Sequence, residues 1–120
     1  MDYTITVAGL VATTPRHLVT EDGLPITSFR LASTDGKDTN WFTITCTKTL
    51  ATNVAQSIKK GERVIVAGRL RVRDWETNSN SDTIAEVEVV SIGHDLAWGK
   101  SQFERTVLVR DNDLEAQGVR

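Results

Sequence analysis

Residues 40–76 decide which fold this chain can adopt, and they read NWFTITCTKTLATNVAQSIKKGERVIVAGRLRVRDWE. Polar and apolar residues alternate over 40–47, which predicts a strand with one buried side. Over 49–60 the apolar residues recur at helical spacing, so we expect a helix there. The alternation returns over 63–76 and predicts a long strand. The stretch is therefore a strand, a helix and a strand in close succession.

The alternation also predicts which side chains face the core. In the first strand of this stretch we expect Phe42, Ile44 and Cys46 to point inward, because successive side chains of a strand point to opposite sides. Trp41 then points outward with the threonines of the same strand. A large ring on a threonine-rich outer side gains little unless something covers it.

The ends of the expected helix carry their own signals. Thr49 can act as the N-cap, because its hydroxyl can accept a hydrogen bond from an unpaired N–H of the first turn. Lys59 and Lys60 suit the negative C-terminal end of the helix dipole, and Gly61 suits the residue after the C-cap.

Three further strands are expected outside this stretch, at 3–11, 26–33 and 83–92. In the first of them, Gly9 indicates a bend or the close approach of another backbone. Five strands of this length cannot all bury one side in a flat sheet that a single helix covers. The expected fold class is therefore all-β with one helix, arranged as a small closed five-stranded barrel. The expected apolar anchors of the second strand are Ile26, Phe29 and Leu31.

Length and composition favour one domain that is not embedded in a membrane. The chain has 120 residues, of which 39% are hydrophobic and 25% charged, as in ordinary globular domains. Its apolar runs are shorter than the roughly 20 residues that span a bilayer, and the N-terminus has no basic signal-peptide region. A single cysteine, Cys46, excludes an internal disulfide framework and fits a reducing compartment, so we expect a cytoplasmic location.

Charge is unevenly distributed along the chain, whose formal net charge is -2. Residues 1–75 carry 10 Lys and Arg against 7 Asp and Glu, whereas residues 76–120 carry 4 against 9. Binding responds to local potential rather than to net charge, so a basic surface can coexist with an acidic remainder.

The long strand 63–76 contains the strongest candidate for a binding surface. Its alternation places one aromatic and three basic side chains on one side, namely Arg69, Arg71, Arg73 and Trp75. Guanidinium groups roughly 7 Å apart repel each other unless something negative lies across them. A phosphate backbone would satisfy this row, and the ring at its end could stack on a base. Alternatively, Glu86 and Glu88 pair with the arginines across a hairpin, and Trp75 covers the end of the barrel.

The other candidates for chemistry are weak. Cys46, on the inward side of its strand, is expected to be an inert core residue. His17 and His94 have no acid or thiol at motif spacing, and the chain has no phosphate loop of the GxxxxGK[ST] type. We therefore expect no enzymatic activity, no catalytic residue, no metal and no cofactor.

In their order and spacing, these segments resemble bacterial single-stranded DNA-binding protein, the homo-oligomeric OB-fold type, in its actinobacterial form. Six motifs over residues 3 to about 96 carry the resemblance: Val7-Ala8-Gly9 with Thr14-Pro15, Phe29-Arg30-Leu31-Ala32, Trp41-Phe42, Asn53-Val54-Ala55 with Lys60-Gly61, Gly68 to Trp75, and Glu86 to Val89 with Ile92-Gly93. The resemblance implies a five-stranded OB-fold barrel. It also implies sequence-tolerant binding of single-stranded DNA in support of replication, recombination or repair, and a place at the bacterial nucleoid.

The resemblance assigns roles to particular residues. Trp41 and Trp75 match the aromatic residues that stack on bases. The implied contacts with the DNA backbone, and the further candidates for DNA contact, are Arg71, Arg73, Arg69, Arg30 and Lys48.

The resemblance also implies a division of the chain and an assembly. Residues 1–96 form the DNA-binding domain. Residues 97–120 form an extension, with a strand at about 103–110 that clamps a neighbouring subunit, followed by a frayed end. The implied assembly is a homotetramer, with a dimer as the alternative. The expected contacts between subunits are Trp98, Phe103, Val107 and Leu108.

Four features depart from the family pattern. Thr47 stands where the family usually has another aromatic residue, the loop 34–40 is short, and Asp74 replaces a residue that is often basic. Residues 118–120 are not the acidic tip through which the family recruits replication and repair proteins, so we do not expect partners of that kind. The thinned set of aromatic residues, the short loop and the acidic second half of the chain support an alternative function, an OB-fold protein-interaction module of a primosome-like assembly that binds DNA weakly or not at all.

Overall fold

A computed structural model of the chain describes residues 3–76 and 81–106, without the side chains of residues 75–76 and 81–82. Its elements, in chain order, are β1 (Tyr3–Val11), β2 (Arg16–Val19), β3 (Pro25–Asp35), β4 (Asp38–Thr47), α1 (Lys48–Ser57), β5 (Arg63–Glu76) and β6 (Ser81–His94). Within these ranges there is no helix long and apolar enough to cross a membrane.

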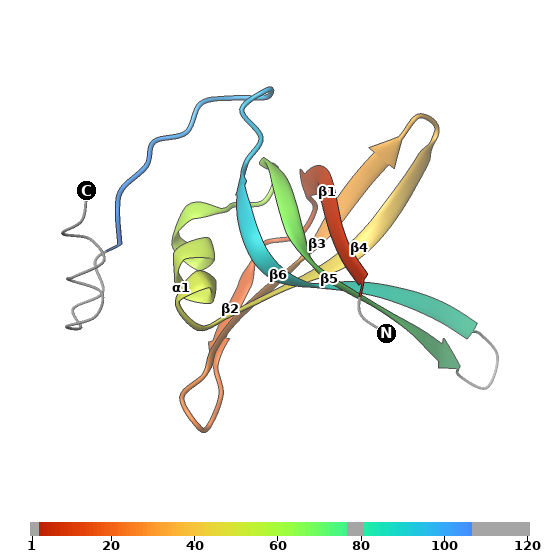
Figure 1. Ribbon diagram of the computed structural model, residues 1–120, viewed down its shortest axis with the longest axis horizontal. Coiled ribbons are helices and arrows are strands. Elements are labelled where there is room, and N and C mark those ends of the chain that lie inside the picture. Colours follow the sequence, from red (N-terminus) through yellow and green to blue (C-terminus); the bar gives the residue numbers. More distant parts are fainter. Residues whose placement is uncertain (1–2, 77–80, 107–120) are drawn as a thin grey trace.

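Five of the strands close into a barrel (Figure 1). Neighbouring strands follow the order β1-β5-β6-β4-β3, and β1 pairs with β3 to complete the ring. That closing contact joins Leu10 to Ala32 and Val11 to Leu31 in antiparallel register. β4 and β6 pair in parallel, and α1 connects β4 to β5. The arrangement confirms the predicted five-stranded OB-fold barrel with one helix.

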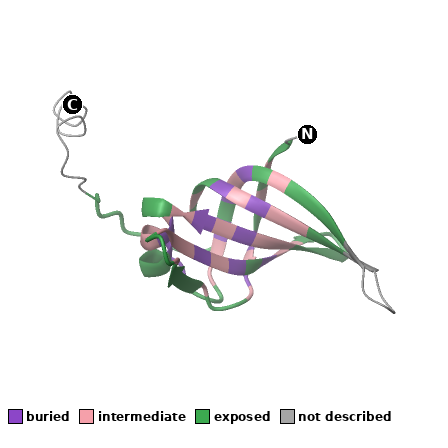
Figure 2. Ribbon diagram, turned by 90° about the horizontal axis from the view of Figure 1, so that it is seen from below, coloured by how far each residue is buried: buried purple, intermediate pink, exposed green. Residues whose placement is uncertain are grey.

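Alternate side chains of the strands, together with one side of α1, fill the barrel. Figure 2 shows buried positions alternating with half-buried and exposed ones along the strands. The inward side of β4 is as predicted, since Phe42 is half-buried and Ile44 and Cys46 are fully buried. Burial raises the pKa of the Cys46 thiol to about 12, so this group stays protonated and behaves as a small apolar side chain. The core consists of Val11, Phe29, Leu31, Ile44, Cys46, Ala51, Val54, Ile58, Val64, Val66, Val87 and Val89.

Two glycines allow neighbouring strands to approach closely. A Cβ atom added at Gly9 would lie 2.4 Å from the carbonyl oxygen of Ala32, which confirms the close approach predicted there. At Gly68 the added atom would lie 2.2 Å from the carbonyl oxygen of Glu88. The register between β5 and β6 shifts at Ala67/Gly68. Such a bulge bends the strand and increases its twist, which a closed barrel requires.

The inward side of β3 differs from the prediction at one position. The expected anchors Phe29 and Leu31 are buried. The third buried residue on their side of the strand is Thr27, whereas Ile26 lies on the other side and is only half-buried. The Thr27 hydroxyl donates to the carbonyl oxygen of Ala51 at 2.7 Å and lies 2.7 Å from Nδ1 of His17. The prediction that Ile26 anchors the strand in the core was wrong. Thr27 takes that position instead, because a threonine hydroxyl that makes both of its hydrogen bonds can be buried at low cost.

The helix begins and ends earlier than predicted. Thr47 occupies the N-cap position, without a side-chain hydrogen bond, so Thr49 lies inside the first turn. The last helical residue is Ser57, and the lysine pair expected in the final turn therefore lies beyond it. Gly61 adopts a positive φ of 92° in the following turn, where its N–H donates to the carbonyl of Val11. Gly61 is therefore not the residue that ends the helix. Its backbone hydrogen bond joins the following turn to β1.

The strand β2 was not predicted from the sequence. It pairs antiparallel with β3 and stands outside the ring. All four of its residues are exposed, so this segment has no alternation that would indicate a strand.

After β6, residues 95–106 run past the α1 side of the barrel without helix or strand (Figure 1). The guanidinium carbon of Arg63 lies 4.1 Å from the centroid of the Trp98 ring and holds the first part of this segment against β5. A clamp strand was predicted at about 103–110. Residues 103–106 form no strand in this single chain, and residues 107–110 lie outside the described residues. The clamp therefore remains a prediction.

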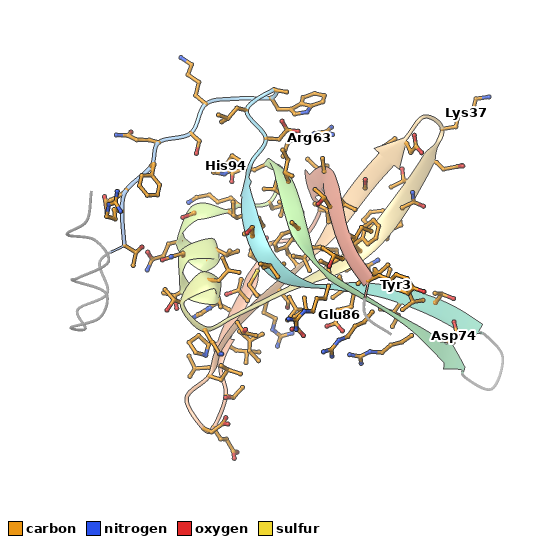
Figure 3. All side chains as sticks on the ribbon, in the orientation of Figure 1. Tyr3, Lys37, Arg63, Asp74, Glu86 and His94 are labelled. Atoms are coloured by element: carbon orange, nitrogen blue, oxygen red, sulfur yellow. The ribbon has the colours of Figure 1, made fainter. Side chains whose placement is uncertain are left out.

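His94, at the end of β6, also fastens this segment to the barrel (Figure 3). Its Nε2 lies 2.9 Å from Oε1 of Glu62, and its Nδ1 lies 2.8 Å from Oγ of Ser101. Burial by itself raises the pKa of Glu62, but hydrogen bonds from His94 and from the Lys59 N–H hold that pKa below its usual value. The carboxylate is thus charged at neutral pH and can accept both hydrogen bonds.

Candidate nucleic-acid interface

Three arginines of β5 form an exposed row on the outer side of the barrel. The side chains of Arg69, Arg71 and Arg73 are 58%, 52% and 63% exposed. They follow alternate positions of the strand, as the sequence predicted. In the register between β5 and β6, Arg69 lies opposite Glu88 and Arg71 lies opposite Glu86.

Each arginine of the row contacts a carboxylate of β6. Glu88 lies 3.7 Å from Nη1 of Arg69 and 3.1 Å from Nη2 of Arg71, and Glu86 lies 2.8 Å from Nη2 of Arg73. Glu86 is labelled in Figure 3 and also accepts a hydrogen bond from Oγ1 of Thr45 at 3.1 Å. Exposed pairs of this kind contribute only about 0.2–1 kcal/mol each. The pairing that the sequence left open is therefore present, but it is too weak to make the arginines inaccessible to a phosphate.

Trp41 lies on the outer side of β4, as the alternation predicted. It is 51% exposed, whereas Ile44 on the opposite side is fully buried. The guanidinium carbon of Arg30, on β3, lies 5.4 Å from the centroid of the Trp41 ring. This cation–π contact was not predicted, because it depends on the register in which Ala32 faces Trp41 across the β3–β4 hairpin.

The register joins these residues into one continuous surface. Arg30 lies opposite Thr43, Thr43 opposite Glu86, and Glu86 opposite Arg71, so a single row crosses β3, β4, β6 and β5. Past this row the β3–β4 and β5–β6 hairpins diverge (Figure 1). We call this surface the arginine–tryptophan face, and its members are Arg30, Trp41, Arg69, Arg71 and Arg73.

Two other predicted DNA contacts are not placed on this face. Trp75 lies opposite Asp82 in the backbone register of the β5–β6 hairpin, but its side chain is outside the described part of the structure. Lys48 is exposed and is the first residue of α1, at the end of β4 away from Trp41. Lys48 lies seven positions further along the chain than Trp41, which corresponds to roughly 23 Å of extended strand.

The predicted subunit contacts form a separate group. Trp98 and Phe103 are 64% and 82% exposed, on the segment after β6. Trp98 contacts Arg63, at the opposite end of β5 from the arginine row. The other two residues of this group, Val107 and Leu108, lie outside the described residues.

The described residues bring no three His, Cys, Asp or Glu side chains together in a way that could hold a metal ion. Cys46 is buried in the core, and His17 is engaged with Thr27. The arrangement instead provides exposed cations beside an exposed aromatic ring. These features, on a closed five-stranded barrel, define a nucleic-acid-binding protein of the OB-fold class.

The comparison with protein families identifies the class more closely. The model of the Single-strand binding protein family matches residues 3–95, and the chain belongs to this family. Its members are non-catalytic binding proteins, so the chain is not an enzyme. Single-stranded DNA-binding protein 2 of Tropheryma whipplei is 50% identical over 112 residues, covering 84% of this chain and 74% of the relative. Single-stranded DNA-binding protein 1 of Streptomyces coelicolor is 41% identical over 114 residues, covering 85% of this chain and 72% of the relative.

Solved structures give the same result. The small single-stranded DNA-binding protein from Streptomyces coelicolor has a TM-score of 0.74 at 41% identity, covering 82% of this chain and 98% of that chain. The second single-stranded DNA-binding protein from Mycobacterium smegmatis has a TM-score of 0.71 at 28% identity, covering 88% of this chain and 100% of that chain. The relatives are actinobacterial, which confirms the resemblance that the six motifs predicted.

Proposed function

We propose that this chain binds single-stranded DNA, independently of base sequence, across the arginine–tryptophan face. The observation that carries the proposal is the continuous register row across β3, β4, β6 and β5, which contains the exposed Arg30 and Arg71 and crosses the strand whose outer side carries the exposed Trp41. The family and the names of the relatives support DNA binding over the alternative of a protein-interaction module.

Two kinds of contact give this face its selectivity for unpaired strands. Trp41 offers a ring on which a base can stack, and a base inside a duplex has no free ring face to offer. In proteins of this family such stacking is generally worth roughly 1–3 kcal/mol per base. The arginines bind phosphates, which are the same in every sequence, so affinity depends little on base identity.

The path of the strand follows from the positions of these groups. The phosphates run along the arginine row of β5, and bases reach over β6 and β4 toward Trp41. Trp75, near the tip of the β5–β6 hairpin, extends the path at one end, and Lys48 extends it at the other.

We also propose that copies of the chain assemble into a homotetramer, with a homodimer as the alternative. The outer side of β1, β5 and β6 supports assembly, because Ile65 and Val90 are 42% and 66% exposed there and Ala8 lies opposite Ile65. Trp98 and Phe103 add exposed apolar surface on the extension, next to the exposed Leu96, and Val107 and Leu108 would contribute to it. Several DNA-binding faces on one particle would let one strand wrap around it.

Such a protein supports replication, recombination and repair, where unwound DNA needs protection. It meets this DNA in the bacterial cytoplasm, at the nucleoid.

Titration with poly-dT, followed by tryptophan fluorescence, tests the function. Binding by stacking quenches the emission, and the quench becomes smaller in a Trp41→Phe variant because one stacked indole is missing. Separation of free and bound protein by sedimentation gives an independent measurement. Absence of both quenching and co-sedimentation at low salt would favour the interaction-module alternative.

A further inference from the structure

Two acidic side chains occupy the centre of the arginine–tryptophan face. Glu86 and Glu88 lie on β6, which runs between the arginine strand β5 and the tryptophan strand β4. Glu88 contacts both Arg69 and Arg71, and Glu86 contacts Arg73. A phosphate track along the row therefore meets carboxylates that already hold the same guanidinium groups.

These contacts are not needed to hold the fold together. The side chains of the three arginines are more than half exposed, and that of Glu88 is 42% exposed, so water and salt screen their attraction. A carboxylate and a phosphate oxygen accept the same hydrogen bonds from a guanidinium group. The two glutamates thus act chemically as substitutes for phosphate.

We propose that Glu86 and Glu88 are built-in competitors of the DNA phosphates, which lower affinity and make release easier. The inference rests on the proposed function of the face. In the free protein, the carboxylates neutralise the arginines and keep them extended in a row. A bound strand displaces the carboxylates from the guanidinium groups, and the stacking of bases compensates for the broken ion pairs. An anion without bases lacks that compensation, so it binds more weakly against the same competition.

The two glutamates differ in how they are held. Glu86 has a side-chain exposure of 23% and is anchored by the hydroxyl of Thr45, so its carboxylate stays close to the sheet. Glu88 is more exposed and neutralises two arginines rather than one. Removal of the Glu88 charge should therefore have the larger effect on DNA affinity.

The test compares Glu88→Gln and Glu86→Gln with the wild-type protein in titrations of a dT oligonucleotide at several salt concentrations. Glutamine keeps the size of the side chain and removes its charge. We expect Glu88→Gln to bind about 3- to 10-fold more tightly at low salt, as removal of one charge near a phosphate implies. The plot of log K against log salt should become steeper, by about 0.7 for each additional phosphate neutralised. Glu86→Gln should show a smaller gain.

Glu21→Gln is the matched control, because it removes the same charge in an exposed turn between β2 and β3. It should leave affinity unchanged. If Glu88→Gln melts at a lower temperature than the wild type, Glu88→Thr is used as a second variant, because threonine also removes the charge and is favoured in strands. Inorganic polyphosphate, which has no bases, should gain affinity from Glu88→Gln by a factor similar to that of the dT oligonucleotide, because the carboxylate competes with the phosphates of both.

The outcomes separate the inference from the function on which it rests. If the wild type binds the oligonucleotide but folded Glu88→Gln and Glu88→Thr bind no more tightly, the competitor role is wrong and the DNA-binding function stands. If neither the wild type nor the variants bind it, the proposed function is overturned and the inference falls with it. If Glu21→Gln gains as much affinity as Glu88→Gln, the gain comes from the change in net charge alone, and the inference is also overturned.

Discussion

The guanidinium carbon of Arg30 lies 5.4 Å from the centroid of the Trp41 ring, and the two side chains stand on the outer side of neighbouring strands. The arginine orients a ring that is half exposed and places a positive charge beside it. A base that stacks on Trp41 therefore brings its phosphate near a cation. The pair links the stacking part of the proposed face to its electrostatic part.

Replacement of Trp41 by alanine is expected to weaken binding to poly-dT by roughly 1–3 kcal/mol, because one stacking platform is removed. Stability should change little, since an exposed ring contributes little to the core and exposed cation–π contacts are worth about 0.5–1 kcal/mol. Fluorescence titration and thermal denaturation measure the two effects. Trp41→Phe is the control and should recover much of the affinity. Unchanged binding in the alanine variant would remove Trp41 from the DNA path.

The arginine row is tested through salt dependence. Arg71→Ala and Arg73→Ala should weaken binding equally for dT and mixed-sequence oligonucleotides, because phosphates carry no sequence information. The slope of log K against log salt should fall by about 0.7 for each phosphate that the variant no longer neutralises. Lys60→Ala, which removes a charge beyond the end of α1, is the control and should keep the wild-type slope. Wild-type slopes in both arginine variants would place the DNA elsewhere on the barrel.

The parts of the fold that were predictable are those with strict alternation. Residues 40–47 and 64–70 carry one more buried and one more exposed side, so both strands and their outward residues there followed from the sequence, whereas all of residues 71–74 are exposed. The strand β2 has four exposed residues and gives no such signal. Thr27 was missed because its burial depends on hydrogen bonds from distant parts of the chain, namely α1 and His17.

The candidate site was predictable to a similar extent. Period-two spacing placed Arg69, Arg71 and Arg73 together without knowledge of any partner strand. The Arg30–Trp41 contact and the choice of glutamate for each arginine depend on strand register, which short-range patterns do not give. The sequence could therefore propose the glutamates as partners but not show that one of them serves two arginines.

Gly68 should tolerate no side chain. A Cβ atom there would lie 2.2 Å from the carbonyl oxygen of Glu88, and a backbone atom cannot yield as a flexible side chain can. We expect Gly68→Ala to lower the free energy of unfolding by roughly 1–3 kcal/mol or more, as overpacking does. Gly99→Ala is the matched control, because nothing lies within 4 Å of the added atom. Urea denaturation of both variants measures the difference, and equal stability would mean that the strands can separate there at little cost.

Deletion of residues 97–120 tests the proposed role of the extension in assembly. Within its own chain, the described extension is held mainly by exposed contacts, such as Trp98 on Arg63 and Thr106 on Asn53, so its removal should leave the barrel folded. Trp98 and Phe103 are 64% and 82% exposed, so burial against another subunit would give this segment most of its stabilising effect. We therefore expect the shortened protein to dissociate in sedimentation at concentrations where the full chain remains assembled, and to melt at a lower temperature that rises with protein concentration. Trp98→Ala should produce a weaker form of the same change, while a shortened protein with the oligomeric state and melting temperature of the full chain would show that the extension clamps no neighbour.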